Sequence, residues 1–328
     1  MKIRLHNLDR QYRELETSLI IANTSALSSG KMMLGDYTLA FEERIAKVAG
    51  AKYCVTVGSG SDALQLGLVA CGVMETTIPA QTYIATQNSV LRAGAICHYA
   101  DVMPNGLIDW NTIKTRDVVW VGLFGNLETL SKDINIYEDG AQHFGHKLQG
   151  IFASYSFDPT KSLPNYGNGG AIVTNDKRIA DTVQNIRRHG TTEDFTGGHS
   201  LMSERECSEM LIKLDHFPFW QERRQELARD YTDQLNEIEG LDIITNPHSL
   251  VSKMVISTPL RPELEYWLFQ RGIETKRVYE QALAYKPGAI YNCNTQLSIP
   301  CDPHTTDEEL LEVILCIKEF FTEFPFES

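Results

Sequence analysis

Short apolar runs alternate with helix-forming stretches through the first two thirds of the chain, and this alternation restricts the possible folds more than any other feature. Tyr53–Val57 has the length of a buried strand, and the apolar residues of Ala63–Cys71 recur at helical spacing. A second helix is predicted over Ala85–Arg92. Further strands are predicted over 96–99, 118–124, 134–137, 151–157 and 170–174, and residues 77–79 form a short strand or a loop. This order predicts an α/β domain over residues 1–214, with a mostly parallel central sheet between two layers of helices.

The pattern changes after residue 214. A long, charged helix is predicted over Phe219–Leu235, followed by a strand over Lys253–Thr258 and a helix over Pro262–Arg271. The last helix is predicted over Thr306–Phe321, because a threonine followed by three acidic residues is typical of a capped helix N-terminus. We therefore expect a smaller α+β domain over residues 215–328, joined to the first domain through the long helix.

Composition excludes several classes of protein. The chain has 328 residues with 30 Lys and Arg against 43 Asp and Glu, and its net charge of −13 disfavours binding to a nucleic-acid backbone. The first residues lack the apolar core of a signal peptide, and no apolar stretch approaches the ~20 residues of a membrane helix. The seven cysteines are scattered and form no Cys-x-x-Cys pair. We therefore expect reduced thiols and a cytoplasmic protein.

Four segments contain residues suited to chemistry, and the first is the turn Gly58–Leu64 between a strand and a helix. Free N–H groups at the start of a helix bind anions, and Gly60 would allow a phosphate to approach the backbone closely. The hydroxyl of Ser61 stands beside them. The same kind of turn is also a purely structural element in many α/β proteins.

The second and third segments follow later strands. Asp139 ends an apolar run, which places it at the carboxyl edge of the sheet, where open α/β folds bind ligands. It could equally be a helix cap or a turn residue. Lys161 follows another apolar run, beside a glycine-rich turn. In a pocket, desolvation would lower the pKa of Lys161 and make its amine a competent nucleophile, whereas most lysines are solvated surface charges.

The fourth segment places Tyr83 on a loop near a strand end, as a ligand-facing ring or as an ordinary core or surface tyrosine. His143 and His146 are spaced like a metal-binding pair. No third ligand stands nearby in the sequence, so we predict no metal site.

The order of these segments is specific when they are taken together. Glu138-Asp139-x-Ala141-Gln142 is followed by Ser156-Phe157-x-x-x-Lys161 and then by the glycine-rich run from Gly167. Shorter motifs extend the pattern over nearly the whole chain: Gly35-x-x-x-Leu39-x-Phe41-Glu42, Ser59-Gly60-Ser61-x-Ala63-Leu64, Pro79-x-x-Thr82-Tyr83-x-Ala85-Thr86 and Arg188-His189-Gly190. The series resembles the DegT/StrS-type family of pyridoxal-phosphate (PLP)-dependent sugar aminotransferases, which have the aspartate-aminotransferase fold (fold type I).

The resemblance implies a role for each residue. Lys161 would hold PLP covalently and then move the proton between the substrate carbon and the cofactor. Asp139 would pair with the pyridine nitrogen and keep it protonated, Tyr83 would stack on the ring, and Gln142 would lie near the phenolic oxygen. The phosphate would be held by residues at the helix start and at a strand end, namely Gly60, Ser61 and Ser156.

Two segments depart from the family pattern. The family commonly has a Gly-x-Asn-x-Arg stretch whose Asn reaches the cofactor phosphate of the neighbouring subunit, and this chain has His199 and Leu201 at those positions. His199 could still donate a hydrogen bond to a phosphate. The family's His-Tyr-x-x-Pro-Leu-His-like loop, which faces the sugar, is replaced here by Arg277–Ala284. The resemblance also implies a homodimer whose active sites are built from both chains.

The leading interpretation is the transfer of an amino group from glutamate to a keto-sugar carried on a nucleoside diphosphate. The cofactor would pass through its pyridoxamine form (PMP) between the two halves of the reaction. One alternative is a sugar 3-dehydratase of the same family, which carries His in place of the lysine, so Lys161 disfavours it. The other is a non-catalytic regulatory protein, which the changes at His199 and Ala284 favour and the intact Lys161 and Asp139 disfavour.

Overall fold

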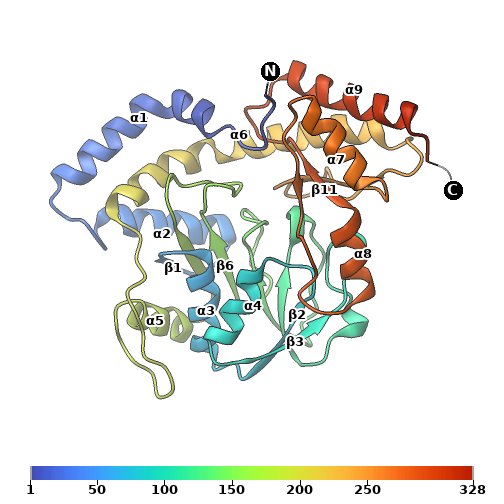
Figure 1. Cartoon of the computed structure of the whole chain (residues 1–328). Coiled ribbons are helices and arrows are strands. Elements are labelled where there is room, and N and C mark those ends of the chain that lie inside the picture. Colours follow the sequence, from blue (N-terminus) through green and yellow to red (C-terminus); the bar gives the residue numbers. More distant parts are fainter. Residues whose placement is uncertain (1, 327–328) are drawn as a thin grey trace.

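The computed structural model describes residues 2–326 and contains a seven-stranded and a four-stranded sheet. In Figure 1 the larger sheet and its helices occupy the lower part of the molecule, and the smaller sheet lies above it with α7 and α9. The long helix α6 (Glu204–Leu235) runs along the top of both parts. The predicted α/β architecture with a mostly parallel sheet is confirmed.

The larger sheet has the strand order β1-β7-β6-β5-β4-β2-β3. Strands β2 to β6 pair in parallel, and β7 runs antiparallel to both of its neighbours. The carboxyl ends of the parallel strands therefore meet at one edge of the sheet. The strands are β1 (Tyr53–Val57), β2 (Glu75–Pro79), β3 (Ile96–Ala100), β4 (Asp117–Val121), β5 (Asn135–Asp139), β6 (Phe152–Ser156) and β7 (Gly170–Thr174).

Helices cover both faces of this sheet, which explains why its central strands are apolar throughout. On β7, Ala171 and Val173 pack into the cluster beneath α2, whereas Ile172 packs into the cluster beneath α3 and α5. A helix-like turn at Leu123–Gly125 follows β4, so the strand predicted over 118–124 ends earlier, at Val121. The helices of this part are α2 (Asp36–Ala49), α3 (Gly60–Cys71), α4 (Ile84–Arg92) and α5 (Lys177–Ile186). Helix α1 (Leu8–Ser28) lies above them and packs on α6.

Helix α6 is 32 residues long and begins well before the predicted start at Phe219, which was wrong. Its N-terminus is a capping box between Ser203 and Glu206. Pro218 lies inside the helix. A proline removes one backbone hydrogen bond, but the packing of a long helix on both domains can outweigh that loss. Because α6 is continuous through residue 214, the division into 1–214 and 215–328 stays a prediction.

The smaller sheet is antiparallel, in the order β10-β11-β9-β8. Its core includes Leu227 and Tyr231 of α6, Leu268 of α7 and Ile317 of α9. Ile3 is buried in the same core and pairs with Ile273, so the N-terminal segment also packs here. The elements are β8 (Asp242–Ile243), β9 (Met254–Ser257), α7 (Arg261–Gln270), β10 (Lys276–Arg277), α8 (Pro287–Thr295), β11 (Gln296–Ile299) and α9 (Asp307–Glu323).

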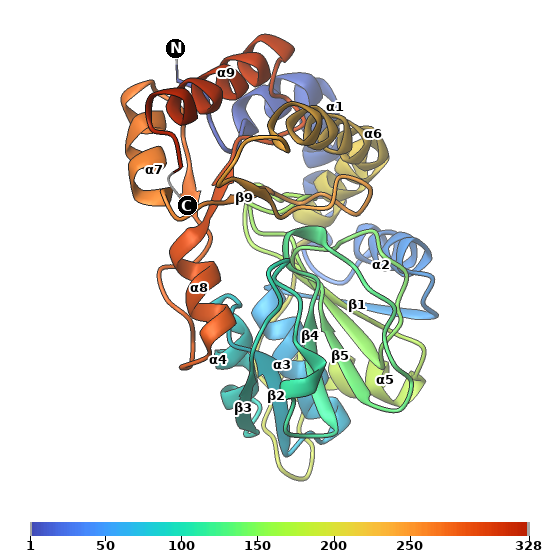
Figure 2. The same ribbon diagram turned by 90° about the vertical axis from the view of Figure 1, so that its right-hand side faces the viewer.

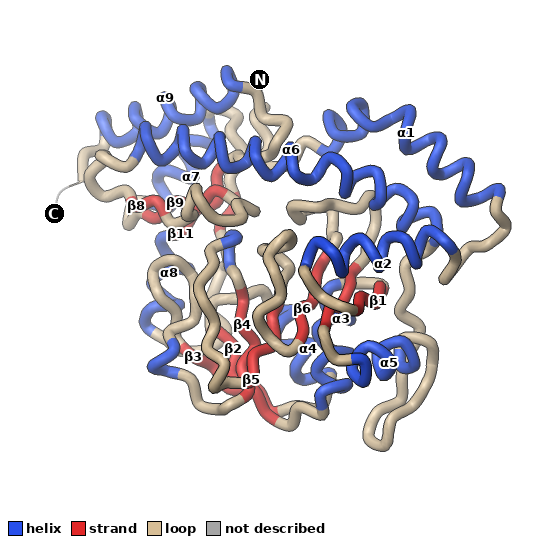
Figure 3. The backbone as a smooth tube through the Cα atoms, turned by 180° about the vertical axis from the view of Figure 1, so that it is seen from behind, coloured by secondary structure: helices blue, strands red, loops and turns tan. Residues whose placement is uncertain are grey.

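Hydrogen bonds between the start of α8 and the residue after β3 help to hold the smaller part above the larger sheet. Asp101, just after β3, accepts hydrogen bonds from the amides of Gly288 and Ala289 at the start of α8. Figure 2 shows α8 reaching down toward this edge, and Figure 3 shows α6 spanning both parts from behind.

The predicted cap of α9 is confirmed, because the Thr306 side chain accepts from the Glu309 amide. Within residues 2–326 no helix is long and apolar enough to cross a membrane.

Candidate active site

The structure brings four of the predicted site residues to one edge of the larger sheet. Asp139 is the last residue of β5, Ser156 is the last residue of the adjacent β6, and Lys161 lies in the loop after β6. The start of α3 lies directly against β6, since a Cβ atom at Gly60 would be 2.6 Å from the Ser156 Cβ atom. This edge is the carboxyl end of the parallel strands, where α/β sheets bind ligands.

The turn before α3 has the form of an anion cradle. Ser59 is the N-cap, and its side chain accepts a hydrogen bond of 3.1 Å from the Asp62 amide. The amides of Gly60 and Ser61 donate to no atom of the described residues. On the other side, a Cβ atom at Gly170 would overlap the carbonyl of Ser59 and lie 2.6 Å from the Gly60 nitrogen. Glycine is therefore required where β7 meets the turn, and the exposed amides suit a phosphate.

A second contact holds this turn from outside. The Ser200 hydroxyl accepts from the Gly58 amide at 2.9 Å and donates to Asp62 at 2.7 Å. The neighbouring His199 is exposed, and its ring centroid lies 5.9 Å from that of His189. His199 therefore stands on the molecular surface beside the cradle rather than in it.

Asp139 is held by a chain of two buried threonines. Its Oδ2 accepts from the Thr86 hydroxyl at 2.7 Å, and its Oδ1 accepts from the Ala141 amide at 3.3 Å. Because the single hydroxyl proton of Thr86 goes to the carboxylate, the Thr82 hydroxyl, 2.9 Å away, must donate to Thr86. The aspartate is thus oriented by α4, and one face of its carboxylate is fixed before any ligand binds.

We predict that Thr86→Val lowers aminotransfer turnover about tenfold, because valine keeps the shape but cannot donate to Asp139, and a hydrogen bond to a charged group contributes ~1.5–3 kcal/mol. The measurement is kcat/KM for the amino donor with saturating cofactor. Thr82→Val is the matched control, since it leaves the bond between Thr86 and Asp139 intact and should cost much less. Equal losses in the two variants would contradict this prediction.

Lys161 is partly buried, and its amine has no hydrogen bond or ion pair within the described residues. Burial lowers its pKa, and the charge of Lys276 adds to this effect, while Asp139 and Asp158 oppose it. A lysine with a lowered pKa is deprotonated in a larger fraction of molecules at neutral pH. The pKa of Lys161 therefore shifts in the direction that the sequence analysis expects for a nucleophilic amine, and its role as a nucleophile stays a prediction.

Gln142 and Tyr83, which are predicted to lie beside the cofactor, differ in burial. Gln142 is buried, accepts from the Phe124 amide at 2.9 Å and donates to the Tyr279 hydroxyl at 3.3 Å. Tyr83 precedes the first turn of α4 and is 59% exposed, so its ring is free to contact a ligand. The sequence analysis does not predict a site role for Tyr279, although this residue lies in the loop Arg277–Ala284, which departs from the family pattern.

His143 has a structural environment. Its ring is fully buried, lies 4.9 Å from the Trp120 ring and contacts Glu138 at 3.3 Å. Glu138 also accepts from the amides of Gln149 and Gly150 at 2.7 and 2.6 Å. In the part of the chain that the structure describes, no group of three or more His, Cys, Asp or Glu side chains is placed to hold a metal ion.

Comparison with known proteins identifies the family. The model of the DegT/DnrJ/EryC1/StrS aminotransferase family matches residues 14–318. The chain belongs to this family. A "pleiotropic regulatory protein" of Geobacillus stearothermophilus is 30% identical, over 99% of this chain and 100% of its own length. The dTDP-3-amino-3,4,6-trideoxy-alpha-D-glucose transaminase of Streptomyces venezuelae is 28% identical, over 96% of this chain and 95% of its own length.

Solved structures agree with this assignment. DesV of S. venezuelae, in complex with a ketimine intermediate, superposes with a TM-score of 0.91 at 27% identity, over 97% of this chain and 98% of DesV. NtdA of Bacillus subtilis with bound PMP shares the fold, with a TM-score of 0.85 at 22% identity, over 96% of this chain and 85% of that chain. The predicted family, fold and aminotransferase class are confirmed. The roles of the individual site residues stay predictions.

Proposed function

We propose that this aminotransferase moves an amino group from glutamate to the ketone of a nucleotide-linked sugar, with PLP and PMP as the two forms of its cofactor. The observation that carries the proposal is the partly buried amine of Lys161, which has no hydrogen bond or ion pair within the described residues and belongs to the same sheet edge as Asp139 and the cradle at Gly60. The names of relatives support the sugar acceptor. Among them are dTDP-sugar transaminases and a UDP-2-acetamido-2-deoxy-3-oxo-D-glucuronate aminotransferase of Pseudomonas aeruginosa that is 29% identical over 86% of this chain.

The residues present fit PLP at each of its functional groups. The free amides of Gly60 and Ser61, with the hydroxyl of Ser156, suit the phosphate. The oriented carboxylate of Asp139 suits the protonated pyridine nitrogen, the exposed ring of Tyr83 suits the flat face, and Gln142 suits the phenolic oxygen. When bound, PLP supplies an electron sink for the electrons left by breaking the C–H bond of the donor.

Lys161 would hold PLP through its Nζ in the resting enzyme. Once the donor amine has replaced it, the freed Nζ would take the proton from the donor carbon and pass it to the cofactor. In the second half of the reaction, with the sugar ketone, the same amine would move the proton in the opposite direction. The lowered pKa of Lys161 suits both steps, since a base must be unprotonated before it can accept a proton.

We also propose a homodimer in which His199 of each subunit reaches the cofactor phosphate of the other. The exposed position of His199 beside the cradle permits such a contact. The surface of α1, of the segment leading into α2 and of the first turn of α2 carries exposed apolar side chains that a second subunit would cover. They are Ile20, Ile21, Leu27, Met32, Met33 and Leu39.

A regulatory role is the second candidate, because two relatives are named a "pleiotropic regulatory protein" and an "erythromycin biosynthesis sensory transduction protein". The departures at His199 and Ala284 are the residues of this chain that favour it. A free amine nucleophile would have no use in that role, so we rank it second.

The visible absorption spectrum of the protein with PLP, before and after glutamate, tests these functions. We expect a long-wavelength band that glutamate removes, and an amino-sugar product after a nucleotide-linked keto-sugar is added. Release of free ammonia instead would indicate the dehydratase. A band that glutamate leaves unchanged would remove glutamate as the donor, and failure to bind PLP would favour the regulatory protein.

A further inference from the structure

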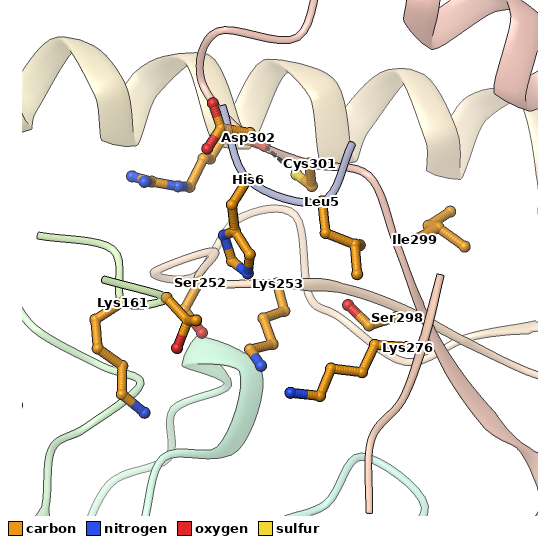
Figure 4. A pocket seen from close by; sticks show the side chains of 12 residues that line it. Leu5, His6, Lys161, Ser252, Lys253, Lys276, Ser298, Ile299, Cys301 and Asp302 are labelled. Carbon is orange, nitrogen blue, oxygen red and sulfur yellow. Dashed lines mark hydrogen bonds between the residues drawn. The ribbon is translucent and has the colours of Figure 1, made fainter. Parts of the chain in front are cut away.

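A narrow cavity next to Lys161 is lined by an excess of positive side chains (Figure 4). Lys161 enters it from the loop after β6, Lys253 from the residue before β9, and Lys276 from β10. Figure 4 shows Lys253 and Lys276 directing their amines toward one another, with Lys161 on the opposite side. Arg224 of α6 and His6 complete the basic lining.

Few acidic groups balance these side chains: Asp158 lies near Lys161 and Lys253, and Asp139 lies near Lys161. Within the described residues, the amines of Lys253 and Lys276 have no hydrogen bond and no ion pair. Arg224 is 5% exposed, and its Nη2 donates to the Ser162 carbonyl at 3.1 Å, while its Nη1 has no partner. Asp302 is the acidic residue of the lining, and its Oδ1 already accepts from the amide and Nδ1 of His304.

Such an arrangement is unfavourable for the protein alone. Burial lowers the pKa of Lys253 to about 8, and the positive charges of Lys161 and Lys276 add to the effect. Burial also lowers the pKa of His6. Arg224 is buried and Lys253 is partly buried, whereas Lys276 is exposed. A buried cation without a full set of partners costs free energy, so the cavity is suited to an anion that comes from outside the chain.

We propose that Lys253 and Lys276 bind a carboxylate group of a substrate and thereby hold its reacting carbon near the amine of Lys161. This inference rests on the proposed aminotransfer. Two ammonium groups that approach one point can each donate a charge-assisted hydrogen bond to a carboxylate oxygen. The cavity has about 30 Å³ of free space, room for about two water molecules. A cavity of this size suits a small anionic group such as a carboxylate.

The site is separate from the cradle proposed for the cofactor phosphate. The cradle lies at the start of α3 against β6 and β7, whereas Lys253 and Lys276 belong to the small antiparallel sheet. A bound substrate would therefore bridge the two parts of the molecule, with its carboxylate on the smaller sheet and its reacting carbon facing the larger one. The carboxylate belongs either to the amino donor or to an acidic sugar, and the experiment distinguishes these sources.

Calorimetric titration of the PLP-loaded protein with unreactive probes tests the site. The probes are glutarate, which mimics the donor, D-glucuronate, which mimics an acidic sugar, and the neutral glutaramide and D-glucose. We expect the wild type to bind at least one acidic probe and neither neutral one. Lys253→Met and Lys276→Met should each weaken that binding at least tenfold, whereas the surface control Lys132→Met should bind within threefold of wild type.

The outcomes separate this inference from the proposed function. Loss of glutarate binding in the variants assigns the carboxylate to the donor, and loss of glucuronate binding assigns it to the acceptor. Unchanged binding in both Met variants, or no acidic probe bound by the wild type, overturns the inference. The inference is also overturned if a variant still binds the acidic probes and only the pH dependence of its absorption band changes. A wild type that forms no PLP band or ignores glutamate speaks against the proposed function instead, and thermal midpoints identify any misfolded variant.

Discussion

Replacing Lys161 with alanine is expected to lower aminotransfer turnover by about 10³-fold or more, because the variant loses both the nucleophile and the proton carrier. The fold should persist. Lys161 is only partly buried, and its amine contributes no hydrogen bond or ion pair to the part of the chain described here. The measurements are turnover with glutamate and a keto-sugar, the absorption spectrum with PLP, and the thermal midpoint.

Two controls make this result specific to the amine. Lys132→Ala removes an exposed lysine and should leave turnover and spectrum as in the wild type. Addition of a small primary amine to Lys161→Ala should restore part of the turnover, because a diffusible base can occupy the space left by the side chain. Full turnover of Lys161→Ala without added amine would refute both the role of Lys161 and the proposed function.

The architecture was predictable because burial on two faces leaves a strong signal in the sequence. The apolar run Gly170–Thr174 predicts a buried strand. It is apolar throughout because its alternate residues pack against different helix layers. The start of α6 was not predictable from local pattern, because a proline at 218 normally marks a helix boundary. Only the packing of α6 against α1, α2 and α9 shows that the helix continues through it.

The candidate site also contains some residues whose position the sequence predicts and others whose position it does not. Asp139, Ser156 and Lys161 end or follow neighbouring strands, so a strand prediction already places them at one edge. Lys253 and Lys276 come from a different sheet, and no spacing rule connects them to Lys161. Their convergence depends on how the two parts of the molecule pack. The bond from Thr86 to Asp139 likewise joins residues that are 53 positions apart.

The second large effect is expected from a substitution at Gly170, where β7 contacts the cradle. Gly170→Ala is expected to lower the affinity for PLP at least about tenfold, because the new Cβ atom would overlap the Ser59 carbonyl and come within 2.6 Å of the Gly60 nitrogen. These are backbone atoms, so the turn itself must move. The amides proposed to hold the phosphate would then be displaced from Ser156. The measurement is fluorescence or absorbance titration of the apoprotein with PLP.

Gly198→Ala is the matched control. It adds the same methyl group at a position where no atom of the described residues lies within 4 Å, so it should leave the thermal midpoint and PLP affinity close to wild type. Gly170→Ala alters neither the side chain of Ser156 nor that of Lys161, so a loss of affinity reports on the geometry of the cradle and of the strands beside it. Wild-type affinity in Gly170→Ala would mean that the phosphate does not bind at the start of α3, and the anion site would have to be sought elsewhere along the sheet edge.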